Sequence, residues 1–414
     1  MHPIAIVILL SLLNLIPLWG ASAKQPAEEP NMKTVQRVVE TLERRFLSPE
    51  NVLYDFVGPT GDVLLPTPEE CRLNQPNAFA WNTPIENGGF FNGDLLAALV
   101  RLHQRHPIPQ FAPFAARLAD GLKHLQDVSP TPACILRGFG SDGRCHYPAS
   151  SADQVTPFLL GLWLYANSDL ASPEERRDCR ERCLRTVRAL RQNRWIIPGT
   201  QPGFERGNLL AKHPHSVNHL LLAAMILDDC ERPDAPQTPQ LITERLDAIA
   251  AGYPDMTPHA CWYSSHNFFI LRLVLERYPD APFSPALQEA LRKTAQAAQA
   301  ALPYWRKYDD ALPFSPNWRE LNAIWFEQRN AADGDRCANP QFGLWRRVSP
   351  AVMHERETIM PSLTAAWFIL FSQDKPLIDA NLPEIRAMLA AIPYETLHYA
   401  PFFFAVNVIA EIEK

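Results

Sequence analysis

Helical hydrophobic periodicity recurs along almost the whole of the 414-residue chain and leaves few architectures open. Apolar residues return at three- and four-residue spacing in segment after segment, and stretches rich in Pro or Gly separate these segments. The pattern predicts helices over 32–46, 92–106, 111–128, 154–165, 173–192, 216–229, 239–251, 262–278, 284–301, 317–330, 358–372, 383–391 and 397–411. Strand-like alternation is limited to two short runs, NVLYDFV at 51–57 and ACILRGF at 133–139. We therefore expect an all-α protein.

Long polar loops alternate with short turns between these helices, and the loops vary too much in length for a regular solenoid. Helical hairpins closed into a ring produce this alternation. We expect an (α/α)6 toroid with its long loops gathered at one end, and a helical-repeat superhelix is the alternative. The loops over 52–87 and 331–357 are too long to be simple connectors, so we expect them to build a site.

The first 23 residues have the features of a secretory signal peptide. An apolar run over 4–19 is too short to span a bilayer, and the small residues of 21–23 follow it as a cleavage site. The remaining residues, 24–414, are expected to form a single catalytic domain that is exported to the periplasm or the extracellular space. No later apolar stretch is long enough to span a membrane.

Eight cysteines would be free to pair in such an oxidising compartment. Cys134 and Cys145 bracket a loop that a disulfide between them would tie. The cysteines do not have the spacing of a zinc site, and we expect neither a metal nor an organic cofactor.

Charge and aromatic content together favour a saccharide partner. The formal net charge is −6, with acids and bases interspersed, which excludes the basic stripe of a nucleic-acid binder. Trp163 and Trp367 lie within apolar helical patterns and are expected in the core. Other tryptophans fall in loops or at helix ends, where their rings suit stacking against sugars: Trp81, Trp195, Trp262, Trp305, Trp318 and Trp345.

Two carboxylates stand where a loop runs into an apolar helix. Glu86 lies among aromatic and Gly residues, whose apolar surroundings raise a carboxyl pKa as a general acid requires. Asp153 follows a bendable loop that contains Arg137 among several glycines, although Asp at this place is also an ordinary N-cap. Asn92 and Asp94 are expected to be helix caps or first-turn residues. Two carboxylates at one end of two helices are the minimum equipment for glycoside hydrolysis.

Polar and aromatic residues of the same loops and helix starts are the candidate substrate contacts. His219 and His266 each sit where a loop turns into an apolar helix, as Asp153 does. In a ring of hairpins these positions share one cavity. The candidates are Asn87, Arg144, His146, Tyr147, Gln154, His219, Trp262 and His266.

Two segments resemble a known enzyme group. DQVTPFLLGLWLY, which begins at Asp153, looks like the segment that bears the catalytic aspartate in six-hairpin unsaturated uronyl and rhamnogalacturonyl hydrolases. FFNGDLLAALVRLHQR, from Phe90, looks like an earlier helix of those enzymes. The resemblance implies that Asp153 protonates the unsaturated ring and helps water to add. The second acid of the family falls near Glu86, where this chain has Glu-Asn-Gly in place of an Asp.

The resemblance and the residues predict an exported glycoside hydrolase that acts on a uronate-containing or related oligosaccharide or polysaccharide. Asp153 and Glu86 are the expected catalytic pair. A polysaccharide lyase on the same toroid is the first alternative, with Asn218 and His219 neutralising a uronate and Tyr147 or Tyr263 as the base. A carbohydrate-binding protein without catalytic activity is the second alternative.

Overall fold

The computed structural model describes residues 28–211, 214–231, 237–250, 265–321 and 343–412. It is all-α, with 65% helix and no strands in the described part. The elements are α1 (Glu28–Thr41), η1 (Leu42–Phe46), α2 (Pro68–Arg72), α3 (Gly88–Arg105), η2 (Pro109–Phe111), α4 (Ala112–Asp127), α5 (Ala152–Ala166), α6 (Pro173–Gln192), α7 (Pro214–Glu231), α8 (Gln237–Ala250), α9 (Ser265–Arg277), α10 (Ser284–Ala298), η3 (Gln299–Lys307), α11 (Trp318–Leu321), α13 (Pro350–Glu357), α14 (Ile359–Phe371), α15 (Lys375–Ala391), η5 (Ala400–Phe403) and α16 (Phe404–Ile412). The all-α prediction is confirmed. The expected signal peptide lies outside the described residues, as does most of the helix expected over 317–330.

The two runs with strand-like alternation do not form strands. In segment 51–57, Leu53 and Phe56 form isolated bridges to Leu47 and Tyr399. Segment 133–139 is extended, and its carbonyl groups are bonded individually: that of Ile135 accepts from the Ser150 hydroxyl at 2.6 Å. Residues 52–57 and 133–139 are all buried, so both runs lie in the core on either side, without a partner strand in the described part of the chain.

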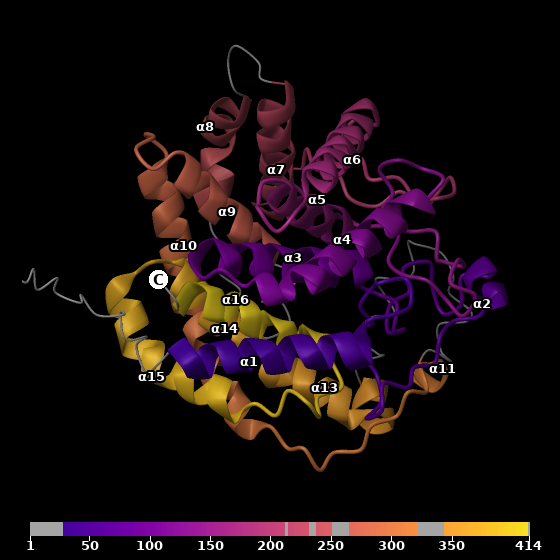
Figure 1. The fold of residues 1–414 in the computed structure, drawn as a ribbon. Coiled ribbons are helices and arrows are strands. Elements are labelled where there is room, and N and C mark those ends of the chain that lie inside the picture. The colour runs from indigo at the N-terminus through magenta and orange to yellow at the C-terminus, as the bar shows by residue number, and fades with distance from the viewer. Residues whose placement is uncertain (1–27, 212–213, 232–236, 251–264, 322–342, 413–414) are drawn as a thin grey trace, which may run out of the picture.

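Six of the described helices contact one another in cyclic order. α3 packs on α5, α5 on α7, α7 on α9, α9 on α14, α14 on α16, and α16 returns to α3. The helices that lie between them in sequence pack outside: α4 and α6 on α5, α8 on α7, and α10 on α9. In Figure 1, α3, α16 and α14 lie side by side, with α1 next to them, so the two ends of the described chain meet. One continuous apolar cluster runs through the described helices from Val35 to Ala410.

The closest contact between helices joins α3 to α5. A Cβ atom at Gly161 would lie 2.7 Å from the carbonyl oxygen of Gly93 and 2.9 Å from its Cα. A Cβ atom at Gly93 would overlap the Pro157 carbonyl. Glycine is therefore required at both positions, since any side chain would separate the two backbones.

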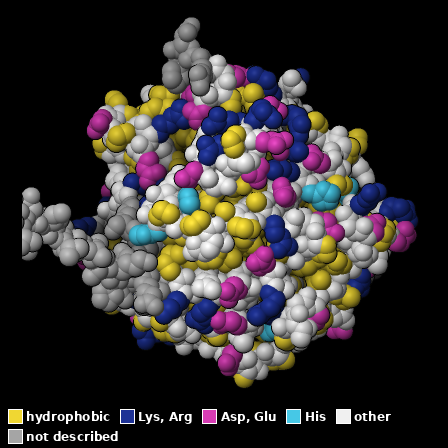
Figure 2. Space-filling model, in the orientation of Figure 1, with side chains coloured by type: hydrophobic (Ala, Val, Ile, Leu, Met, Phe, Trp, Pro, Cys, Tyr) yellow, Lys and Arg dark blue, Asp and Glu magenta, His cyan; other side chains and the backbone are white. Residues whose placement is uncertain are grey.

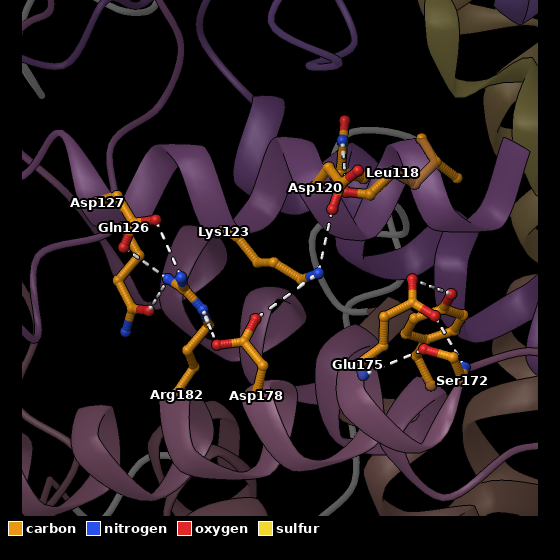
Figure 3. Close-up of polar contacts among 11 residues, drawn as sticks. Leu118, Asp120, Lys123, Gln126, Asp127, Ser172, Glu175, Asp178 and Arg182 are labelled. Atoms are coloured by element: carbon orange, nitrogen blue, oxygen red, sulfur yellow. Dashed lines mark hydrogen bonds and ion pairs between the residues drawn. The ribbon is translucent and has the colours of Figure 1, made fainter. Parts of the chain in front are cut away.

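Ion pairs link several of the helices. Arg182 of α6 pairs with Asp127 of α4 at 2.6 Å, and Lys123 of α4 lies 3.7 Å from Asp178 of α6 (Figure 3). Arg101 of α3 forms a two-point ion pair with Glu276 of α9 and another ion pair with Glu411 of α16. On the face drawn in Figure 2, acidic and basic side chains are interspersed. Every helix in the described ranges is too short or too polar to cross a membrane.

Candidate functional site

The candidate site lies where several of the six helices begin. Glu86 and Asn87 directly precede α3, and Asp153 is the second residue of α5. His266 is the second residue of α9, and His219 lies in the second turn of α7. The close contact of Gly93 with α5 fixes the first two of these helix starts beside each other.

Gln154 joins the two helix starts. Its side chain is fully buried, and its Nε2 donates to the Glu86 carbonyl and to Asn87 Oδ1, both at 3.4 Å. Its Oε1 accepts from the Phe90 backbone N–H at 3.3 Å. Gln154 thus links the start of α5 to the start of α3, next to Asp153 in the sequence and in contact with the Glu86 backbone.

Arg137 is a buried cation between the same two segments. Its guanidinium donates to the Glu86 carbonyl at 3.0 Å and to the hydroxyl of Ser151, the N-cap residue of α5, at 3.1 Å. It also lies 5.5 Å from the centre of the Phe79 ring, and Arg206 lies 5.3 Å from the same ring. The two arginines bring positive charge to the start of α5.

Asp153 is suited to hold a proton near neutral pH. Burial raises its pKa to about 6, and the charge of Glu86 adds to the shift, while Arg137 and Arg206 oppose it. The side chain is nevertheless 42% exposed. The carboxyl is therefore surrounded by protein but open to solvent on one side, so a ligand can reach it. Ser151, not Asp153, is the N-cap of α5, so the ordinary capping role does not account for this acid.

Glu86 has a second carboxylate as its neighbour. Glu86 accepts a hydrogen bond from the Asn82 backbone N–H at 2.7 Å. Asp55, which is buried, accepts two from Asn87, from the backbone N–H at 2.8 Å and from the side-chain amide at 2.6 Å. Burial raises the pKa of both carboxyls, and the charge of Glu86 raises that of Asp55 further, whereas Arg356 lowers both. The sequence analysis missed Asp55; its signal was a lone acid inside an apolar run.

The two histidines form a buried layer next to Asp153. Their rings stack with centroids 5.3 Å apart, and His266 Nε2 lies 3.8 Å from Asp153 Oδ1. Thr156 fixes the His219 ring through a 2.7 Å hydrogen bond to Nδ1. Asn267 Nδ2 lies 3.3 Å from His266 Nε2. The structure thus brings both predicted histidines to the same place as the predicted catalytic acid.

Asp94 lies in this layer as well, which corrects the expectation that it caps a helix. α3 begins at Gly88, so Asp94 and Asn92 are inside the helix, and both are buried. Asp94 accepts a 2.8 Å hydrogen bond from the Ser265 hydroxyl. Burial raises its pKa to about 8, and the charge of Asp153 contributes in the same direction. Asn92 instead binds backbone groups, among them the Leu53 N–H at 2.9 Å.

Asp153, His219 and His266 also offer three atoms of the kind that bind metals, all within 4.8 Å of one another. Ligands of a tetrahedral zinc ion, at bond lengths near 2.1 Å, lie only about 3.4 Å apart. The three side chains would have to move toward one another to share an ion. The three groups form a polar cluster whose present spacing is wider than that of the ligands of a tetrahedral ion.

Three predicted contacts belong to another part of the fold. Arg144 is exposed, and its backbone N–H binds Asp142 Oδ1 at 2.9 Å. His146 Nδ1 lies 2.9 Å from the Arg144 carbonyl. Tyr147 is buried, and its hydroxyl donates to the Gln75 carbonyl. None of these contacts involves Asp153 or Glu86. Trp262 lies outside the described residues.

The described loop tryptophans separate into half-buried and buried residues. Trp318 and Trp345 are buried, so their predicted stacking on sugars is wrong; Trp345 packs edge-on against Phe56. Trp81 is half-buried and stacks on Phe79 with ring centres 4.6 Å apart, beside the arginines of the site. Trp163 and Trp367 are buried as predicted.

No protein-family model matches this chain, and no curated protein is detectably similar to it in sequence. Interpretation of the site therefore depends on its own geometry.

Proposed function

We propose that this protein is an exported glycoside hydrolase with an (α/α)6 toroid fold, and that it acts on a uronate-containing or related oligosaccharide. The cyclic contacts of α3, α5, α7, α9, α14 and α16 support the toroid. The resemblance of the segment from Asp153 to uronyl hydrolases supports the class of substrate.

One observation carries the proposal. The pKa values of the Asp153 and Glu86 carboxyls are both raised, and Arg137 and Gln154 bind the Glu86 carbonyl next to the start of α5. Asp153 opens to solvent and is protonated below a pH of about 6, so it is the general acid. Glu86 is the partner that takes a proton from the attacking water. For an unsaturated uronyl ring, Asp153 delivers its proton to the double bond before water adds.

The charges around Asp153 favour an anionic sugar. Arg206 is half-buried and close enough to lower the pKa of Asp153. Its guanidinium provides a fork that matches a substrate carboxylate. Trp81, half-buried on Phe79, offers a flat apolar surface for a sugar ring in the same region.

The test follows reducing ends and the ultraviolet absorbance of the C4=C5 uronate together. The mature protein is incubated with uronate-containing polysaccharides and with the oligosaccharides that lyases release from them. Falling absorbance on the oligosaccharides is the result expected for an unsaturated uronyl hydrolase. New reducing ends at constant absorbance would instead indicate an ordinary glycosidase. Rising absorbance on intact polymer would overturn the proposal in favour of a lyase.

Asp153→Asn should lower turnover by about 10²–10⁴-fold, the usual contribution of a general acid. The exposed Asp280 provides the matched control, and Asp280→Asn should leave turnover unchanged. If Asp153→Asn retains turnover within a few-fold of wild type, Asp153 is not the acid. A protein that binds sugars without turnover in either form would be a carbohydrate-binding protein.

A further inference from the structure

Two segments far apart in sequence are joined at the edge of the helical body. The Ser141 backbone N–H donates to the Pro66 carbonyl at 2.8 Å, and the Gly140 N–H donates to the Cys145 carbonyl at 2.8 Å. These bonds place the turn over 140–145 against the start of α2. The turn leads along the chain to Ser151 and the start of α5.

The α2 side of this joint is fixed independently. Thr67 and Glu70 form a reciprocal capping box at the start of α2. Arg319 of α11 forms a two-point ion pair with Glu70 and donates to the Leu65 carbonyl at 3.2 Å. These contacts hold Cys71, one residue further along α2, in a constant position.

Cys71 and Cys145 meet at this joint. Cys71 is 4% exposed and Cys145 is half-buried. Burial raises the pKa of the Cys71 thiol, and the neighbouring Cys145 thiol contributes to the shift. The Cys145 sulfur lies 3.8 Å from the Pro66 carbonyl oxygen. Gly140 leaves room for that sulfur, because a Cβ at this position would overlap it. Both thiols are free in the structure.

Cys134, the partner suggested for Cys145 by the sequence, lies elsewhere. It is buried and its thiol is also free. The fold therefore replaces the expected pair, because the turn over 140–145 folds onto α2 instead of back onto residue 134.

We propose that Cys71 and Cys145 form a disulfide that fastens α2 to the loop before α5 when the folded protein meets a low-molecular-weight disulfide. The more accessible Cys145 thiolate attacks one sulfur of oxidised glutathione, and one glutathione thiol leaves. The Cys71 thiolate then attacks the Cys145 sulfur of the mixed disulfide and releases the second glutathione thiol. The two protein thiols lose two electrons and two protons, and the two glutathione thiols carry them away.

This inference is independent of the proposed hydrolase activity. The crosslink would lie in the loop that leads into the candidate site, because Arg137 precedes Cys145 in that loop and Ser151 follows it. Burial raises the pKa of the Cys145 thiol, and Asp142 adds to the shift, so the exchange should speed up as pH rises.

The folded mature protein is treated with oxidised glutathione at pH 8, alkylated under denaturing conditions, digested and analysed by mass spectrometry. We expect one linked peptide pair containing Cys71 and Cys145, and a loss of two alkylatable thiols relative to untreated protein. Cys71→Ser and Cys145→Ser should each abolish that loss, while Cys134→Ser should retain it in full.

A linked pair of Cys134 and Cys145 would overturn the proposal, as would full alkylation of Cys71 after treatment. Cys145→Ser could fold poorly, so wild-type protein supplies a second readout. Oxidation should slow native-state proteolysis within 64–75 at least tenfold, and dithiothreitol should restore the original rate. Proteolysis unchanged by oxidation would also count against the proposed crosslink.

Discussion

A methyl group added at Gly161 should force apart α5, which contains Asp153, and α3, which Glu86 directly precedes. The new Cβ would lie 2.7 Å from the Gly93 carbonyl oxygen, whereas ordinary contact begins at 3.4 Å. The backbones of α3 and α5 must therefore separate locally by about 0.7 Å. The obstructing atoms are backbone atoms, so no side-chain rotation can relieve the overlap.

The sign of the stability change caused by Gly161→Ala tests whether the new methyl group overlaps the Gly93 backbone. Replacing Gly by Ala inside a helix should stabilise the protein by about 1 kcal/mol when nothing obstructs the methyl group. Overpacking a tight contact costs about 1–3 kcal/mol, and the upper part of this range applies to a contact with backbone. We therefore expect Gly161→Ala to lower the free energy of unfolding by about 1–2 kcal/mol. Gly93→Ala, with the more severe overlap, should lower it further.

Denaturant titration measures the stability change, and turnover measures the effect on the site. A displacement of this size between catalytic groups should reduce turnover about tenfold or more. Ala116→Gly, at a half-buried position of α4, calibrates the intrinsic Gly–Ala difference in this protein. If Gly161→Ala is more stable than wild type by the amount that Ala116→Gly loses, the reasoning about this contact is refuted.

Three further predictions concern charge. The pKa of Asp153 is about 6, so kcat/KM should fall as pH rises above 6, where the general acid loses its proton; a flat profile from pH 5 to 8 would remove it from that role. Arg101→Met should cost about 3–5 kcal/mol in chemical denaturation, because Glu276 and the fully buried Glu411 lose their counter-charge; a loss below about 1 kcal/mol would contradict this. Asp94→Asn should flatten the pH dependence of stability between pH 5 and 8, because it removes a carboxyl that stays protonated in the folded state but ionises in the unfolded chain.

The sequence predicted the helices well because a period of 3.6 residues directly records which side chains are buried. It also predicted that Glu86, Asp153, His219 and His266 meet, since each occupies a loop-to-helix junction. In an array of helical hairpins, the helices whose N-termini follow the long loops have those N-termini at the same end of the array. Their mutual contacts follow from this rule and need no knowledge of the individual loops.

Asp55 and Arg206 could not be found in the same way. Neither begins a helix, so whether their loops reach the site depends on the path of the whole chain. Asp55 lies in the run that was interpreted as a strand, and its bonds to Asn87 form only when that run crosses the start of α3. Arg206 lies in a polar loop, and its position depends on contact with Phe79.

The start of α3 was misplaced for a packing reason. The sequence predicts a helix from residue 92, since glycines such as Gly88 and Gly89 usually weaken helices, whereas α3 begins at Gly88. Both residues are helical, and a Cβ at Gly89 would lie only 3.0 Å from Gln154 Oε1. A Cβ at Gly88 would overlap the Arg137 carbonyl. The pair is present because α3 begins under the loop that carries Arg137, and this shift moved Asp94 from a cap into the helix.

Asp94 offers a way to separate stability from catalysis. Its pKa is raised to about 8, whereas in the unfolded chain it is about 3.9. Between these pH values the folded state keeps a proton that the unfolded state releases, so stability is lost as pH rises, by up to about 1.4 kcal/mol per pH unit. Asp94→Asn removes this loss and retains an acceptor for Ser265.

In wild-type protein between pH 6 and 8, Asp153 is ionised while Asp94 stays protonated. The two carboxyls together therefore carry one negative charge instead of two. Asn at position 94 preserves that charge state. The rate profile of Asp94→Asn should therefore keep its fall near pH 6, although its stability profile flattens. If the fall in rate moves by a full pH unit, Asp94 and Asp153 titrate as one coupled pair, and Asp153 alone cannot be the general acid.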